Sequence, residues 1–516
     1  MSSILRPFPL LFTGVGVLSL IVTGSALGYV KIATAKLVTN TKNGSNEMVA
    51  LDKKGQVAVF VSNSDHLAGV APPATGAFDY DGAGNGFASG AAPSPSCTNC
   101  LPVDENAGNL YLWRLKKKGD QPANSIRQLT SSATGGFDAN SHPDMDSKAQ
   151  WVAWTSDQDH LGSNNDGNSE IFLVELDTDT IMQVTHTMGG GDKANRTATI
   201  SDKGRFIAFD STRDYAEAGN CKRPDGTTAC SNPDHNSEVM FYDREAGTFT
   251  QVTDTSGDGN DAHEYPRISI DASHIVFKST RSFAGVLGGG VTCVGSTGGC
   301  ANDSNGEIML YEIGERILTQ VTDTINQAGC NDKTSNERPE VSKKGKYVVF
   351  QSECEEQLNA AGCGRCNGND EVFYFETKKG EISQVTISDA GWNRVPRIAP
   401  TGSYIAWDTN RSYFGLNASH NEKLFIMKRG STKPRAGLTA KMQVVEDEEL
   451  ADLNVVQHPR SQATTIQFDG GFPGSERIGI SGNGRHVAFE SSKNVGNQEI
   501  WLVDRNRCDH AYPDCL

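Results

Sequence analysis

The chain has 516 residues and carries 47 Lys and Arg against 63 Asp and Glu, a formal net charge of -16. No segment concentrates basic residues into a stripe, so binding to a phosphate backbone is disfavoured and nucleic acid is not expected as a partner. The 54 glycines and the many Asn, Asp and Ser residues are typical of a turn-rich β protein.

The most apolar stretch is residues 9–30, which follow Arg6 as in a secretory signal. Small residues offer cleavage after Gly28 or Ala35. We therefore predict a signal peptide over residues 1–35 and export to the periplasm or the extracellular space. The same stretch is long enough to stay as a signal anchor, and only then is membrane association expected.

One short apolar strand recurs along the chain, ending in an aromatic residue with Ser or Thr two positions later. Its seven copies are VAVFVS (57–62), WVAWTS (151–156), FIAFDS (206–211), HIVFKS (274–279), YVVFQS (347–352), YIAWDT (404–409) and HVAFES (486–491). Such a unit cannot bury its own apolar face and must stack on its copies. The chain is therefore predicted to be a repeat protein.

Each copy has further strands around this one. A turn and a first strand precede it. A third strand follows a loop of variable length: LYLW (110–113), EIFLV (170–174), EVMFY (238–242), EIMLY (307–311), EVFYF (371–375), KLFIM (423–427) and EIWLV (499–503). A fourth strand of the type QVT usually follows, with AGLT (436–439) as the sixth copy. Four antiparallel strands with period-2 alternation make one propeller blade, so we predict an all-β, seven-bladed β-propeller.

The last repeat lacks a fourth strand, and Lys36-Leu37-Val38-Thr39 matches the missing pattern. We predict that this N-terminal strand completes blade seven and closes the ring, which removes its open edges. The propeller then covers residues 36–505. An insertion over 440–474 separates blades six and seven, and a Cys-bearing tail follows over 506–516.

The repeat unit resembles the WD40-like (PD40) repeat of TolB-type propellers. The resemblance is clearest in Ser201-Asp202-Lys203-Gly204-Arg205-Phe206-Ile207-Ala208-Phe209 and in Ser481-Gly482-Asn483-Gly484-Arg485-His486-Val487-Ala488-Phe489. It implies the propeller fold, but it leaves the function open, because the family includes periplasmic scaffolds, propeller domains of serine peptidases and some polysaccharide lyases.

The twelve cysteines form close couples, as expected for disulfides that staple loops in an oxidising compartment. The expected pairs are Cys97 with Cys100, Cys221 with Cys230, Cys293 with Cys300, Cys330 with Cys354, Cys363 with Cys366, and Cys508 with Cys515. The two C-x-x-C couples would also suit metal binding or redox chemistry.

Nearly all the long loops fall on one face of the predicted ring, here called the loop-rich face. The other face, the turn face, carries short turns, with the turn over 114–126 as the exception. Loops carried on a rigid scaffold are where binding usually occurs. Several of these loops alternate Asp, Asn and Gly, which suits either a calcium site or an ordinary turn. The candidate metal ligands are Asp166, Asp303 and Asp370.

A second candidate site is a ring of charged residues at the start of the first strands, near the central channel. Its members are Glu47, Arg196, Glu264, Glu337, Arg394 and Glu476, with Ser141 as the seventh position. This ring would bind a polar ligand, or it would join the blades through ion pairs. An adjoining Asn column and the Glu residues that begin five third strands are expected to make structural bonds.

Catalytic signals are few. No G-x-S-x-G motif occurs, which argues against a serine peptidase. His66, His142, His160 and His263 lie on or near the loop-rich face and would serve a metal-assisted polysaccharide lyase, or they are solvated side chains. We therefore predict a non-catalytic binding or scaffold propeller that contacts a protein or a glycan, with the lyase as the alternative.

Overall fold

The computed structural model describes most of the propeller. The described residues are 33–39, 45–63, 108–119, 125–132, 139–189, 195–216, 219–257, 263–283, 286–287, 291–294, 305–324, 336–354, 366–386, 391–410, 423–429, 442–446, 478–491 and 498–504. The predicted signal peptide lies almost entirely outside these ranges. Within them, no helix is long and apolar enough to cross a bilayer.

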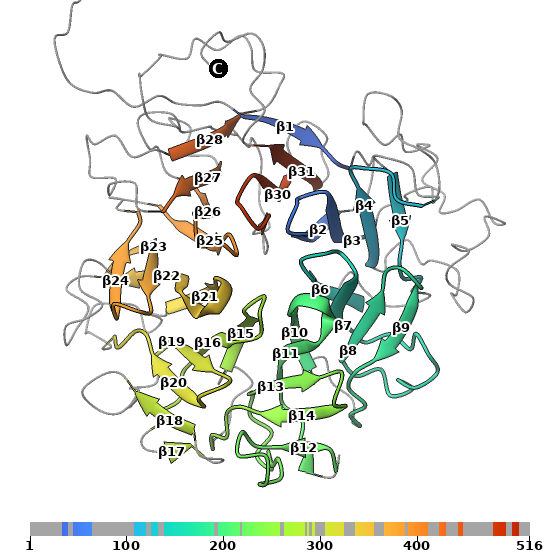
Figure 1. Cartoon of the computed structure of the whole chain (residues 1–516), viewed down its shortest axis with the longest axis vertical. Coiled ribbons are helices and arrows are strands. Elements are labelled where there is room, and N and C mark those ends of the chain that lie inside the picture. Colours follow the sequence, from blue (N-terminus) through green and yellow to red (C-terminus); the bar gives the residue numbers. More distant parts are fainter. Residues whose placement is uncertain are drawn as a thin grey trace, which may run out of the picture.

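The strands form seven four-stranded antiparallel blades around a central axis, as predicted (Figure 1). The first strands lie nearest the centre: β2 (Asn46–Leu51), β6 (Asn140–Met145), β10 (Asn195–Ile200), β15 (His263–Ile268), β21 (Asn336–Val341), β25 (Asn393–Ile398) and β29 (Gly479–Ile480). The second strands are β3 (Val57–Ser62), β7 (Trp151–Ser156), β11 (Phe206–Ser211), β16 (His274–Ser279), β22 (Tyr347–Cys354), β26 (Tyr404–Thr409) and β30 (His486–Ser491).

The outer half of each blade consists of the third and fourth strands. The third strands are β4 (Asn109–Arg114), β8 (Glu170–Glu175), β13 (Glu238–Asp243), β19 (Glu307–Glu312), β23 (Cys366–Glu376), β27 (Lys423–Lys428) and β31 (Glu499–Asp504). The fourth strands are β5 (Ser125–Gln128), β9 (Thr180–Gln183), β14 (Thr248–Gln251), β20 (Ile317–Gln320), β24 (Glu381–Gln384), β28 (Met442–Glu446) and β1 (Ala33–Leu37). In two blades a 3-10 turn connects the first strand to the second, at Asp202–Gly204 and Lys343–Gly345.

The core is divided among the seven blade interfaces, each of which holds its own apolar cluster. The recurring aromatic of the second strand fills these interfaces: Phe60, Trp154 and Phe209, for example, are fully buried. Neither face of a blade is left for solvent, which is why the second strands alternate so little between apolar and polar residues. The repeat motif is thus a packing motif.

The fourth strands end two residues earlier than the QVT motif predicts. The Thr of that motif lies beyond the strand, and its hydroxyl accepts the backbone N–H of the second residue of the third strand. Thr185 Oγ1 accepts from Ile171 N at 2.8 Å, and Thr253 Oγ1 accepts from Val239 N at 2.8 Å. The side chain thereby continues the hydrogen-bond ladder and satisfies a buried donor.

The N-terminal segment lies in the corresponding place in blade seven. β1 pairs antiparallel with β31, with Leu37 opposite Trp501. Thr39 Oγ1 accepts from Ile500 N at 2.8 Å, as the Thr of the other blades does. Val38 is buried in the cluster between blades seven and one. That this segment holds the ring closed stays a prediction.

Blade six differs from the expectation. The strand that pairs with β27 is β28, with Phe425 opposite Val444, although the sequence pointed to 436–439, which lie outside the described residues. β28 also pairs in parallel with β1, where Ala33 is opposite Val445, so blades six and seven share one continuous sheet. The segment expected to be an insertion therefore begins with a strand of the propeller.

Two of the long loops run along the outer edges of their blades, although they were expected only on the loop-rich face. β12 (Cys221–Lys222) pairs in parallel with β14, and the hairpin β17 (Val286–Leu287) and β18 (Val291–Val294) pairs with β20. These additions cover edges that would otherwise be open.

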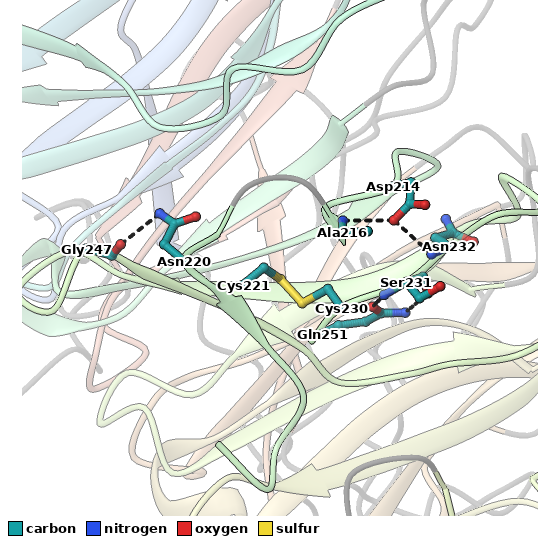
Figure 2. Close-up of a disulfide and its surroundings, with 9 residues drawn as sticks. All are labelled: Asp214, Ala216, Asn220, Cys221, Cys230, Ser231, Asn232, Gly247 and Gln251. Carbon is teal, nitrogen blue, oxygen red and sulfur yellow. Dashed lines mark hydrogen bonds between the residues drawn. A yellow bond between two sulfur atoms is a disulfide. The ribbon is translucent and has the colours of Figure 1, made fainter. Parts of the chain in front are cut away.

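A disulfide joins Cys221 to Cys230 as predicted, next to β14 in blade three (Figure 2). In blade five, the backbone of Cys354 lies opposite that of Cys366 in the register of β22 and β23. Cys97, Cys100, Cys300, Cys330, Cys363, Cys508 and Cys515 lie outside the described residues. The other predicted disulfides therefore stay predictions.

Candidate functional site at the channel

The predicted charged ring occupies one layer of the channel. Glu47, Arg196, Glu264, Glu337 and Arg394 are each the second residue of a first strand, and Ser141 holds the same place in β6. Glu476 lies outside the described residues. Because the first strands run from the loop-rich face to the turn face, this layer lies at the loop-rich end of the channel. We call it the channel mouth.

Ion pairs fix the side chains of the mouth. Lys278 Nζ lies 3.0 Å from Glu264 in its own blade and 3.1 Å from Glu337 in the next blade. The pKa of the Lys278 ammonium is raised: burial disfavours its charge, but the attraction of Glu337 and Glu264 outweighs burial. The ring therefore joins two blades at this point, whereas the binding of a polar ligand by the ring stays a prediction.

Two further ion pairs hold the arginines of the mouth. Arg196 pairs with Asp210 of its own blade at 2.8 Å, and Arg394 pairs with Asp370 of the preceding blade. Ser45 donates a hydrogen bond of 2.6 Å to Glu47. The charged side chains of the mouth are thus held in place before any partner arrives, which lowers the conformational entropy lost on binding.

The mouth carries an excess of negative charge. The strand register places Asp210, Lys278 and Asp408 opposite Arg196, Glu264 and Arg394, and Glu490 accepts a hydrogen bond from Met48 N. Its described carboxylates at these positions and in these ion pairs are Glu47, Asp210, Glu264, Glu337, Asp370, Asp408 and Glu490, and the cations are Arg196, Lys278 and Arg394. An acidic mouth attracts cationic partners and repels anionic ones.

Below the mouth, six of the first strands carry a β-bulge that the sequence did not reveal. At each bulge a non-glycine residue has a positive φ: Met48, His142, Thr197, Tyr265, Arg338 and Val395, between 49° and 58°. This conformation is costly for β-branched Thr197 and Val395. Its repetition in six blades indicates a requirement of the fold rather than of one reaction.

The Asn column and the Glu residues of the third strands bond to each other across the blade interfaces, as predicted. Asn195 Nδ2 donates to Glu170 Oε2 at 3.0 Å, and Asn336 Nδ2 donates to Glu307 Oε2 at 3.1 Å. In blade seven, Glu499 accepts from Asn46 of blade one at 3.0 Å. Each bond joins a third strand to the first strand of the next blade.

Blade four replaces the Asn by His263, whose Nε2 lies 3.5 Å from Glu238 Oε2. Burial raises the pKa of Glu238 to about 8 and lowers the pKa of His263 to about 3. Burial likewise raises the pKa of Glu307 to about 7. Since burial disfavours every one of these charges, these groups belong to the buried frame of the blades rather than to a solvent-filled site.

The described histidines proposed for a lyase, His142, His160 and His263, are not gathered at one point. His160 was expected to be a ligand or a solvated side chain, but it is half-buried, bonds to Asn140 Oδ1 at 2.9 Å, and packs against Trp154 and Phe172. His263 is fully buried, and His142 lies in the bulge of β6. His66 lies outside the described residues, within which no cluster of three His, Cys, Asp or Glu suits a metal.

The candidate metal ligands lie in separate blades. Asp166 is exposed and accepts the Gly189 N–H at 2.7 Å, whereas Asp370 is buried against Arg394. Asp303 lies outside the described residues. The loop of Asp166 has a counterpart in blade three that did not stand out in the sequence: Asn164-Asn165-Asp166-Gly167-Asn168 corresponds to Asn232-Pro233-Asp234-His235-Asn236.

Both loops hold their amides in the same way. Asn164 Nδ2 donates to Asn168 O at 2.9 Å, and Asn232 Nδ2 donates to Asn236 O at 2.8 Å. Asp214 accepts the Asn232 N–H close to the disulfide (Figure 2). Several buried oxygens of these loops find no hydrogen-bond partner among the described residues: Oδ1 of Asn164, Asn168, Asn232, Asp234 and Asn236.

No profile of a known protein family matches the chain, and no curated protein does either. Among solved structures, the chain is similar to TolB from Acinetobacter baumannii, with 16% identity, 64% of this chain covered and a TM-score of 0.35. It spans 58% of the length of that TolB.

Two further solved structures cover more of the chain. The oligogalacturonate lyase from Vibrio parahaemolyticus shows 10% identity over 93% of this chain and 97% of its own, with a TM-score of 0.47. The β-propeller domain of the Trilobed protease from Pyrococcus furiosus shows 10% identity over 90% and 94%, with a TM-score of 0.45. Similarities at this level say nothing about what the chain binds.

Proposed function

We propose that this chain is an exported, non-catalytic binding propeller of the TolB type that engages a protein partner through its loop-rich face. The observation that carries the proposal is the acidic, pre-organised channel mouth. Its carboxylates outnumber its cations, so the partner surface is a polypeptide segment rich in Lys or Arg. The Cys221–Cys230 disulfide supports export, because such bonds persist in oxidising compartments.

We test this proposal by comparing a charge change on the loop-rich face with the same charge change on the turn face. Glu47→Lys alters the channel mouth, whereas Glu315→Lys makes an equal change in net charge at an exposed turn between β19 and β20 on the turn face. Octalysine binding, measured by isothermal titration calorimetry at low salt, should weaken about fivefold or more in Glu47→Lys and stay within about twofold of wild type in Glu315→Lys.

Equal losses in the two variants would contradict the proposal, because they would reflect only the net charge of the protein. Raising the salt concentration should weaken the wild-type interaction, since screening acts on exposed charges. Octaglutamate of the same length serves as the anionic control.

The alternative function is a metal-assisted polysaccharide lyase. It requires a group of metal ligands and a site that accepts an acidic glycan. The packing of His160 against Trp154, the burial of His263 and the negative charge of the mouth all weigh against it. A glycan partner without turnover stays compatible with the binding proposal if the glycan is neutral or cationic.

We also propose that the loops at Asn164–Asn168 and Asn232–Asn236 bind calcium. Their support is the alternation of Asn and Asp oxygens around a tight turn, together with the buried oxygens that lack a partner among the described residues. Calcium bound to the folded state would stabilise it by mass action. Chelation should therefore lower the melting temperature and millimolar calcium should restore it, and the Asp234→Asn variant should respond less. An unchanged melting temperature would assign both loops to ordinary turns.

A further inference from the structure

A cavity of about 130 Å³ lies on the axis of the ring, below the bulges and towards the turn face. It is lined by the last residues of the first strands and by turn residues such as Lys53 and Ser147. Aliphatic side chains such as Ile200, Ile268 and Ile398 share its walls with charged and polar groups. A cavity of this size can hold a small organic molecule.

Two buried arginines line the cavity from blades four and six. Arg267 of β15 and Arg397 of β25 are 8% and 7% exposed. They occupy the same place in their strands, the fifth position, and β21 between them contributes Glu340 at that position. The three side chains therefore form one layer of the channel.

The arginines share a single carboxylate oxygen. Arg397 Nη1 donates to Glu340 Oε2 at 3.0 Å, whereas Arg267 Nε is 3.9 Å from the same oxygen and has no hydrogen-bond partner among the described residues. The other oxygen of Glu340 accepts Val341 N at 3.2 Å. A guanidinium offers five N–H donors, so most of the donor capacity of this pair is left over.

The remaining charged residues of the lining are engaged elsewhere or add positive charge. Asp144 accepts the backbone N–H groups of Met145 at 2.9 Å and Ile200 at 3.0 Å. Lys53 adds a third cation to the lining. Burial, and after it the repulsion of Arg267, lower the pKa of Arg397 to about 10 despite the attraction of Glu340 and Asp144. A buried guanidinium without its acceptors is costly unless a ligand provides them.

We propose that this axial cavity binds a small aliphatic carboxylate, whose carboxylate group pairs with Arg267 and Arg397 and whose hydrocarbon part contacts the isoleucine and valine walls. Arginine pairs with carboxylates through two parallel hydrogen bonds, which suits the free donors. The same chemistry is present in a free short-chain acid and in the C-terminal Val or Ile of a polypeptide that enters from the turn face. This site is separate from the channel mouth, so a failure of the proposed function would not contradict carboxylate binding, and the reverse also holds.

Isothermal titration calorimetry with 3-methylbutanoate tests the proposal on the full chain. We expect a dissociation constant of about 1 mM or lower, within the range for a ligand of this size. The neutral analogue 3-methylbutanamide and inorganic phosphate, which lack the charge and the hydrocarbon part respectively, should each bind at least tenfold more weakly. Comparing Ala-Ala-Val with its C-terminal amide distinguishes a chain terminus from a free acid as the source.

Two variants locate the site. Arg267→Met keeps the length of the side chain but removes its charge, and it should weaken 3-methylbutanoate binding at least tenfold. Arg205→Met removes the same charge from a partly exposed residue that pairs with Asp243, and it should leave binding unchanged. Absence of binding at 10 mM (about ten times the expected constant), or equal binding of acid and amide to the wild type, would overturn the proposal even if Arg267→Met failed to fold.

Discussion

Removal of residues 36–40 is expected to lower the melting temperature of the propeller by about 5 °C. The deletion removes the buried Val38 from the cluster between blades seven and one, and it removes the hydroxyl of Thr39 that accepts Ile500 N. It also breaks the pairing of β1 with β31 and exposes the edge of β31. Burial of one such side chain and about three hydrogen bonds amount to roughly 4–6 kcal/mol.

Other contacts between blades seven and one remain after this deletion. Gly482 N donates to Lys53 O at 2.9 Å, and Asn46 N donates to Gln498 O at 2.9 Å. The protein should therefore stay folded at room temperature and lose its stability on heating. The matched control is Thr386→Ala, which removes the equivalent hydroxyl from blade five and leaves the junction of the ring intact. A deletion with an unchanged melting temperature would show that the N-terminal strand does not hold the ring closed.

Replacing Gly204 by Ala is expected to destabilise the propeller by at least about 3 kcal/mol. Gly204 lies in the turn between β10 and β11 at a φ of 62°, where a Cβ atom would overlap the ring of Trp151 in the preceding blade. The same fit of a turn glycine against the first residue of a second strand recurs at Gly345 with His274 and at Gly402 with Tyr347. These contacts interlock neighbouring blades.

Gly247→Ala is the control for this substitution. Gly247 has a φ of 65°, but nothing lies within 4 Å of the position that its Cβ would take. Its replacement should cost only the backbone strain, about 1 kcal/mol. Ala149 and Ala272 already occupy the corresponding turns of blades two and four at φ values of 51° and 55°, so the dihedral angle alone does not require glycine.

A double-mutant cycle separates the two contributions. In a Trp151→Val background, which reproduces the valine found at the start of β3, Gly204→Ala should cost about as little as Gly247→Ala. Melting temperatures of the four proteins provide the measurement. If Gly204→Ala were equally harmful with and without Trp151, the interlock would not be the cause.

The sequence predicted the fold well because the same pattern of buried residues occurs in all seven blades. The second strands lie where the aromatic motif indicates, since their buried positions leave little choice of register. The fourth strands were less well predicted. The Thr of QVT bonds through its side chain, and in blade six β28 replaces the expected segment.

The site was harder to predict, because it depends on which residues of different blades meet. Comparison of the seven repeats places Glu264 and Glu337 in one layer of the channel. The lysine that joins them, Lys278, belongs to a second strand and is not part of that layer in the sequence. The bulges displace the register of the first strands between the mouth and the cavity. The pair of Arg267 and Arg397 therefore did not stand out in the sequence, although both residues follow the bulge at the same position.

Incubating the wild-type protein with a panel of acidic polysaccharides, with and without divalent cations, tests whether the loop-rich face binds a cationic polypeptide and catalyses nothing. Lyase action creates unsaturated sugars, which ultraviolet absorbance detects. We predict no increase in absorbance with any member of the panel and measurable binding of octalysine under the same conditions. An absorbance increase that depends on enzyme concentration, and that is lost on replacing His142, would contradict it.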